Sequence, residues 1–199
     1  MNIAIIGTGN VGSALGASLS KAGHNVTFAG RVANKADAIR DAEVIILAVP
    51  YGAVAQVSAE IAPFVDGKVV IDTTNPLKSD LSGLATDGGP SAAELIATAL
   101  PGAHVVKAFN TVFAGIQADP GSSSEPVDAL FATDNEEARA TVTQLAESIG
   151  FRPVYVGPLA AARELEAVAF MNIRLQVITG GSWNTAVKLV DPPAKAMAA

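Results

Sequence analysis

The chain has 199 residues, of which half are hydrophobic and 16% are charged, and its formal net charge is −6. This length suits one well-buried α/β domain. The acidic balance argues against nonspecific binding to nucleic acid or to an anionic membrane. The absence of cysteine excludes disulfides, thiolate nucleophiles and cysteine-ligated metal sites.

The apolar run at residues 2–6 is too short for a signal peptide and lacks its basic flank. No stretch reaches the roughly 18 uninterrupted apolar residues typical of a transmembrane helix. We therefore expect a cytoplasmic protein whose partners are small molecules, with neither a membrane nor a nucleic acid among them.

Apolar runs alternate with helical patterns through residues 1–158. We expect strands at 2–6, 25–30, 43–50, 68–76, 104–112, 128–134 and 152–158, and helices at 10–22, 53–62, 91–100 and 135–150. This alternation predicts an α/β, Rossmann-like, doubly wound and mostly parallel sheet. Only residues 32–42 separate the second run from the third, which leaves room for one short helix. The third strand of the usual fold is therefore predicted to be missing, so that the second strand lies at the sheet edge.

The segment 159–199 has no strand partner and is expected to be a C-terminal helical extension that forms one compact unit with residues 1–158. We expect residues 159–190 to form a helix, interrupted at Gly180-Gly181, that packs over the carboxyl edge of the sheet, and the last nine residues to be disordered. The apolar tail with Trp183 fits a homodimer contact or packing on its own sheet, and both readings stay open. The loops 78–91 and 118–126 are rich in Gly, Ser, Pro and Asp and are candidate lids.

Residues 7–12, GTGNVG, match the pattern G-x-G-x-x-G between an expected strand and an expected helix. Gly7 permits a tight turn, Gly9 lets a pyrophosphate approach the backbone, and Gly12 lets the helix pack close to the strand. The N–H groups that begin the helix then face the phosphates. Glycine triplets also occur by chance, but this context favours a dinucleotide-binding loop over an ordinary strand–helix turn, which makes residues 1–158 a nucleotide-binding domain.

The end of the second strand indicates which dinucleotide is bound. NAD-binding chains carry an acid there, which binds the ribose hydroxyls and would repel a 2′-phosphate. Here the run ends FAGR, with Lys35 one turn later and no acid before Asp37. Arg31 can stack on adenine and grip the phosphate with two N–H groups, and Lys35 adds a point charge. The two cations could instead be solvated loop residues, but their presence without an acid favours NADP.

Few residues suit proton transfer or metal binding. His24 lies in a turn and His104 begins a strand, so both are expected away from the edge where ligands bind. Lys107 could act as an acid but fits a salt-bridged structural residue better, and Asp72 fits a hydrogen-bonded turn acid. No cluster of His, Asp and Glu has metal-ligand spacing. A His–Asp proton relay and a metal site are therefore both disfavoured.

The expected strand ends carry small and neutral groups instead, in the stretches 49–51, 74–77 and 109–112. Such a site can hold two flat rings face to face and exclude water while offering few proton donors. That suits hydride transfer between two cofactors, where positioning supplies most of the rate.

Six stretches follow one another along the chain: GTGNVG, AGR with Lys35 after it, AVPYGAV, DTTNPL, VKAFNTVFA and the tail AFMNIRLQVITGGSWNTAVKLV. Together, over nearly the whole chain, they resemble the NADPH-dependent coenzyme F420 reductases, also called F420-dependent NADP oxidoreductases. The same fold recurs in the reductase domain of membrane ferric reductases. The resemblance implies direct hydride exchange between NADP(H) and the deazaflavin ring of F420, with no catalytic side chain.

The resemblance also implies where each ligand lies. Thr8, Gly9, Asn10 and Val11 match the pyrophosphate loop, and Gly30, Arg31 and Lys35 match the 2′-phosphate pocket. Pro50, Tyr51 and Ala55 match the wall near the adenine ribose and pyrophosphate, and Ala114 and Thr185 approach the nicotinamide. Asn110 and Val112 lie beside the deazaflavin, with Asn75 and Pro76 in the same pocket; at Asn110 the archaeal-type pattern has a histidine.

The anionic tail of F420 needs cations, for which Lys78, Arg163 and Arg174 are candidates, unless they are only surface charges. Two other functions remain open. One is an NADPH-dependent reductase of another acceptor, such as a flavin, a quinone, ferric iron or an imine. The other is a non-catalytic NADP-binding regulator on the same fold.

Overall fold

The computed structural model describes residues 1–30, 35–123 and 125–190. Seven strands form one sheet in the order β2-β1-β3-β4-β5-β6-β7. The strands are β1 (Asn2–Ile6), β2 (Asn25–Ala29), β3 (Val44–Leu47), β4 (Val69–Asp72), β5 (His104–Ala108), β6 (Asp128–Thr133) and β7 (Arg152–Gly157). The helices are α1 (Asn10–Lys21), α2 (Lys35–Ile39), α3 (Val54–Ile61), α4 (Ala92–Ala99), α5 (Ala114–Ala118), α6 (Glu136–Ser148) and α7 (Ala162–Thr179).

The predicted Rossmann-like class is confirmed, and so is the missing strand. Strand β2 pairs only with β1 and forms the sheet edge, because the short helix α2 is what connects it to β3 in the described part of the chain. Strands β1 to β5 are parallel. Strand β6 runs antiparallel to β5, and β7 runs parallel to β6.

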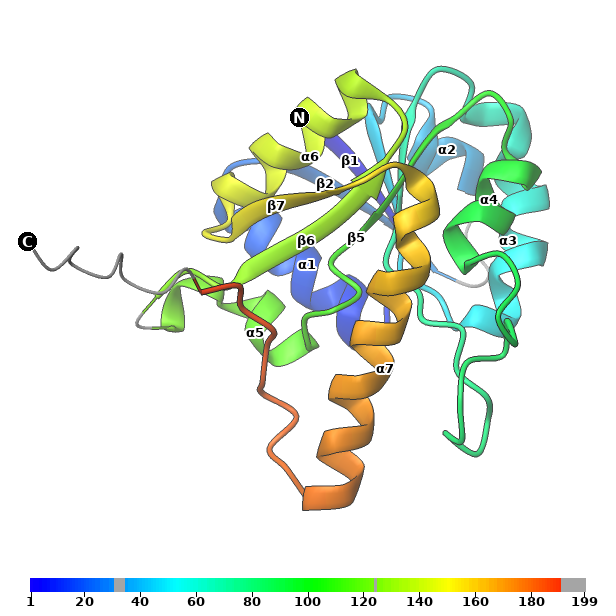
Figure 1. Ribbon diagram of the computed structural model, residues 1–199. Helices are drawn as coiled ribbons and strands as arrows, with labels where there is room; N and C mark the ends of the chain where they lie inside the picture. The colour runs from blue at the N-terminus through cyan, green and yellow to red at the C-terminus, as the bar shows by residue number, and fades with distance from the viewer. Residues whose placement is uncertain (31–34, 124, 191–199) are drawn as a thin grey trace, which may run out of the picture.

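Helices cover both faces of the sheet (Figure 1). The apolar cluster on one face unites the sheet with α1, α5 and α6, through residues such as Leu15, Ile116 and Leu145. The cluster on the other face unites it with α2, α3, α4 and the start of α7, through residues such as Ile61, Ile96 and Ala162. Two-sided burial explains why residues 3–6 of β1, the whole of β3 and residues 69–71 of β4 are apolar.

The C-terminal segment differs from the expected interrupted helix. Helix α7 ends at Thr179 and is capped by Gly180, which adopts the left-handed conformation (φ +61°) that glycine tolerates best. Residues 181–190 do not resume a helix and run back beside α5 toward the first residues of β6 and β7 (Figure 1). There the Leu189 N–H donates to Asp128 Oδ2, and Arg152 donates to the Leu189 carbonyl. The helices in the described ranges are all too short or too polar to cross a membrane.

Candidate functional site

The carboxyl ends of the parallel strands bring the predicted site residues to one edge of the sheet. Gly7, Gly30, Ala48, Thr73 and Phe109 directly follow β1, β2, β3, β4 and β5. The first three line one cavity, and the last two line a second. This edge is where open α/β sheets bind ligands.

The first cavity has a volume of about 660 Å³ and lies at the glycine loop. Its wall combines Gly7, Thr8 and Gly9 with Gly30, Lys35, Pro50, Gln56 and Glu60. Tyr51 and Ala55 are not in this wall, where their neighbours Gly52, Ala53 and Gln56 stand. Arg31 lies outside the described residues.

The three loop glycines differ in the space around them. A Cβ on Gly7 would lie 2.1 Å from the Ala48 carbonyl oxygen, and one on Gly12 would lie 2.3 Å from the Gly7 carbonyl oxygen. Gly7 also has φ +119°, which disfavours any other residue. A Cβ on Gly9, in contrast, would meet no atom within 4 Å. The loop is therefore tight on its protein side and open on its cavity side, as a backbone that receives a pyrophosphate requires.

Helix α1 completes this anion site. Gly9 is its N-cap and provides no side-chain cap, and its first turn carries no acid. The first N–H groups of the helix are thus left to a ligand, and the helix dipole favours a negative charge at this end. The residues fit the pyrophosphate of a dinucleotide.

The second cavity has a volume of about 350 Å³ and adjoins the loop through Asn10 and Val11. Asn75, Asn110, Val112 and Ala114 line it, as does α7 through Ala169, Asn172 and Ile173. Pro76 is buried and does not line it. The described lining carries no charged side chain, so this cavity suits a flat, neutral ring system.

Aromatic residues close one side of the second cavity. Trp183 and Phe113 both line it, and their rings meet edge to face with centroids 5.5 Å apart. Thr185 is not in the lining of this cavity; its Oγ1 donates to Asn172 Oδ1 at 2.7 Å and accepts from Gln176 Nε2. The returning segment is thus held on α7 by polar contacts beside the cavity.

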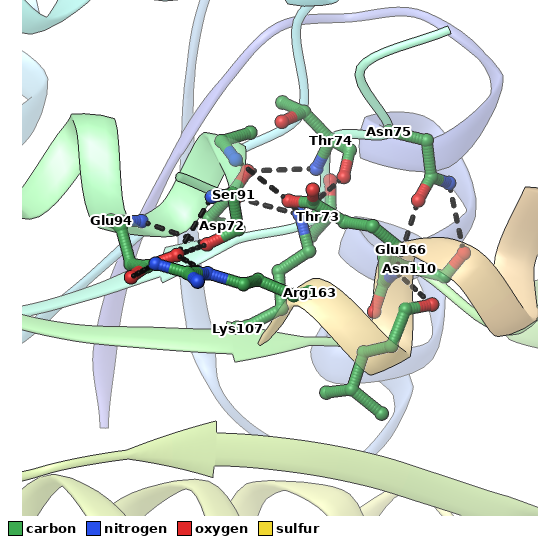
Figure 2. Close-up of polar contacts among 12 residues, drawn as sticks. Asp72, Thr73, Thr74, Asn75, Ser91, Glu94, Lys107, Asn110, Arg163 and Glu166 are labelled. Atoms are coloured by element: carbon green, nitrogen blue, oxygen red, sulfur yellow. Dashed lines mark hydrogen bonds and ion pairs between the residues drawn. The ribbon is translucent and has the colours of Figure 1, made fainter. Parts of the chain in front are cut away.

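Next to cavity residues Thr73 and Asn75, a buried ion cluster joins the sheet to α7 (Figure 2). Lys107 Nζ lies 2.8 Å from Asp72 Oδ2 and 2.9 Å from Glu166 Oε1, and it also donates to the Thr74 carbonyl. The side chains of Lys107 and Asp72 are 0% exposed and that of Glu166 is 1% exposed. Burial raises the pKa of Glu166, although Lys107 opposes the shift. This supports the structural roles predicted for Lys107 and Asp72.

The cluster is tied to the cavity wall on both sides. Asp72 Oδ1 accepts from the Thr74 N–H, which fixes the loop that leads to Asn75. Asn110 Nδ2 donates to Asn75 Oδ1 and to the Leu165 carbonyl of α7, and Asn75 Nδ2 donates to the Asn110 backbone carbonyl (Figure 2). The position of α7 over the second cavity is therefore fixed by buried polar groups.

The remaining candidates lie away from both cavities or are already paired. His24 contacts Ser148 and the N-terminal amine, and His104 begins β5 at the opposite edge of the sheet. Lys78 pairs with Asp87, and Arg163 binds Glu94 through two N–H groups. Arg174 is exposed and has no ion pair with another residue that the structure describes.

Three cavity residues escape a reading of the sequence alone. Glu60 and Gln56 occupy one face of α3, but nothing in their spacing indicates that Lys35 lies opposite them. Trp183 could be found only by knowing that the chain turns back after Gly180.

Two family profiles match parts of the chain. One is described as ketopantoate reductase PanE/ApbA and matches residues 3–42, and the other is described as NADP oxidoreductase, coenzyme F420-dependent, and matches residues 30–76.

Similar proteins extend the match to most of the chain. The F420-dependent NADP reductase of Methanothermobacter marburgensis is 33% identical over an alignment that covers 89% of this chain and 93% of that protein. Metalloreductase STEAP3 of Rattus norvegicus is 30% identical over 83% of this chain, but the match spans only 36% of the length of STEAP3. A crystal structure from Arthrobacter sp. FB24, of a candidate F420-dependent NADP reductase, has a TM-score of 0.83 at 27% identity and covers 95% of this chain and 100% of that one. The chain belongs to the family of F420-dependent NADP reductases.

Proposed function

We propose that this chain is an oxidoreductase that transfers a hydride between NADP(H) and the deazaflavin coenzyme F420. The observation that carries the proposal is the pair of cavities that meet at the glycine loop. Gly9 lines the first and Asn10 lines the second. A dinucleotide that extends along the loop from one cavity would present its nicotinamide to the other.

In this proposal the protein binds and orients the two rings, and the cofactors supply the chemistry. Thr8, Gly9, Asn10 and Val11 receive the pyrophosphate, while Gly30, Arg31 and Lys35 receive the adenosine end. Val11, Val112 and Ala114 provide apolar walls that keep water from the hydride path. The described lining of the second cavity contains no acid or base, so in this proposal the step depends on alignment of the two rings.

The experiment mixes the purified chain with NADPH and oxidised F420 and follows the absorbance of each. We expect the concentrations of NADPH and of oxidised F420, calculated from their absorbances, to fall by equal amounts, because one hydride leaves NADPH for each deazaflavin reduced. Tight NADPH binding without deazaflavin reduction would contradict the proposal.

One observation favours a second candidate, a reductase of a flavin or a quinone. Lys78 and Arg163, two of the three cations proposed for the anionic tail of F420, are engaged in ion pairs, which leaves Arg174 beside cavity residue Ile173. The same assay with a free flavin or a quinone in place of F420 separates the two candidates.

We also propose that the chain acts in the cytoplasm, that residues 159–199 form one unit with residues 1–158, and that α7 provides a homodimer contact. Met171, Leu175 and Ile178 follow helical spacing on α7, and each is about half exposed or more. An apolar face of this kind is typical of an interface. Light scattering during size-exclusion chromatography tests the dimer.

A further inference from the structure

The wall that α3 contributes to the dinucleotide cavity holds an acid opposite the predicted phosphate-binding lysine. Glu60 and Gln56 are one helical turn apart and both line the cavity. Glu60 Oε2 lies 2.7 Å from Lys35 Nζ, and Gln56 Nε2 donates to Glu60 Oε1 at 2.8 Å. Both carboxylate oxygens have a partner, so the carboxylate is held beside the ammonium group.

The charges of this pair cancel inside the cavity. Lys35 and Glu60 are the charged side chains that line it within the described ranges. The Lys35 side chain is only 11% exposed, and that of Glu60 is 39% exposed. The hydrogen bond from Lys35 lowers the pKa of Glu60, so the carboxylate is ionised at neutral pH. Lys35 therefore does not offer a free positive charge to an entering ligand.

From this geometry we propose that Glu60 is a specificity-determining residue that limits the preference for NADP(H) over NAD(H). The inference rests on the proposed function, because it requires that the adenosine end of the dinucleotide binds beside Lys35. It assigns an opposing role to a side chain on α3, away from the end of β2, where the absence of an acid and the presence of Arg31 are expected to favour NADP(H).

Two effects of the Glu60 carboxylate act in the same direction. A 2′-phosphate carries a charge of about −1.5 to −2 at neutral pH, so it is repelled by Glu60 and must share Lys35 with it. A 2′-hydroxyl is neutral, and a carboxylate near it can accept its hydrogen bond, as the strand-end acid of NAD-binding proteins does. Glu60 therefore weakens the binding of NADPH and does not weaken the binding of NADH.

The test measures the dissociation constants of NADPH and NADH by isothermal titration calorimetry for the unaltered chain and for Glu60→Gln. The amide keeps the size of the side chain and still accepts the Gln56 hydrogen bond, but it removes the charge. We expect NADPH to bind about tenfold more tightly, which is about 1.4 kcal/mol. We expect the affinity for NADH to change less than about twofold or to decrease, because the neutral 2′-hydroxyl is not repelled by the Glu60 carboxylate.

Glu147→Gln is the matched control, because it makes the same change in net charge on α6, which packs on the opposite face of the sheet. Lys35→Met is the converse variant and should weaken NADPH about tenfold or more with little change for NADH. An unchanged or lowered NADPH preference in Glu60→Gln, relative to this control, would overturn the inference while leaving the proposed function standing. Failure of the unaltered chain to bind either dinucleotide would overturn both.

Discussion

Replacing Lys107 with methionine tests whether the buried ion cluster stabilises the fold. Lys107 is fully buried, and its ammonium group is within 2.9 Å of both Asp72 and Glu166. The substitution keeps the volume of the side chain and leaves two buried carboxylates without a cation. Removing one partner of a buried pair costs about 3–5 kcal/mol, a large part of the roughly 5–15 kcal/mol that stabilises a typical domain.

Thermal and urea unfolding, followed by circular dichroism, measure the loss. For a chain of this length each kcal/mol lowers the melting temperature by about 2–4 °C, so we expect a decrease on the order of 10 °C. The charge explanation has an internal control in the triple variant Lys107→Met, Asp72→Asn, Glu166→Gln. The two amides can still accept the hydrogen bonds from the Thr74 and Ala92 N–H groups, so this variant should regain most of the lost stability. A loss below about 1 kcal/mol in the single variant, or no recovery in the triple variant, would refute the reasoning.

The pH dependence of Glu166→Gln gives a second measurement on the same cluster. Burial raises the pKa of Glu166 in the folded chain above its ordinary value of 4.5. The protonated form therefore favours folding: its contribution is complete below the ordinary value and is lost as the pH rises through the folded pKa. The amide does not titrate, so the stability of Glu166→Gln relative to the unaltered chain should increase with pH across that window.

Three further predictions concern the loop, the cofactor and the acid limit of stability. Gly12→Ala should destabilise the fold more than Gly9→Ala does, and should also weaken NADPH binding, because of these two positions only Gly12 would place a Cβ against the backbone, 2.3 Å from the Gly7 oxygen; calorimetric binding and melting curves of both variants check this. Arg31→Ala should weaken NADPH far more than NADH, and equal losses would show that Arg31 does not contact the 2′-phosphate. Arg163 lowers the pKa of Glu94 to about 2 from 4.5, so the stability that this pair contributes is complete above about pH 4.5 and is lost as the pH falls toward 2. Glu94→Gln should remove about 1 kcal/mol at neutral pH, because water screens half-exposed Arg163, and should remove less in acid, because Glu94 is then protonated.

Local patterns predicted the part of the site that local geometry determines. The strand, the glycine loop and the helix follow one another in the chain, so the spacing of their residues was enough to predict this part of the site. The absence of the third strand could also be predicted, because the 11 residues at 32–42 are too few to form a helix and a further strand. Contacts across the sheet were not readable. The pairing of Lys35 with Glu60 and of Lys107 with Glu166 depends on how α3 and α7 pack, which no short-range spacing specifies.

The reversed strand β6 explains how a C-terminal helix becomes part of the site. Because β6 and β7 run opposite to β5, β7 ends near the edge of the sheet where β1 to β5 begin. Helix α7 therefore starts at that edge, and its 18 residues span about 27 Å. That length carries Glu166 to the last residues of β4 and β5 and carries Asn172 and Ile173 past them into the second cavity. A parallel β6 would have ended at the ligand-binding edge, and a helix after it would have led away from the cavity. The reversal of β6 thus supplies the second cavity with a wall that the parallel strands do not provide.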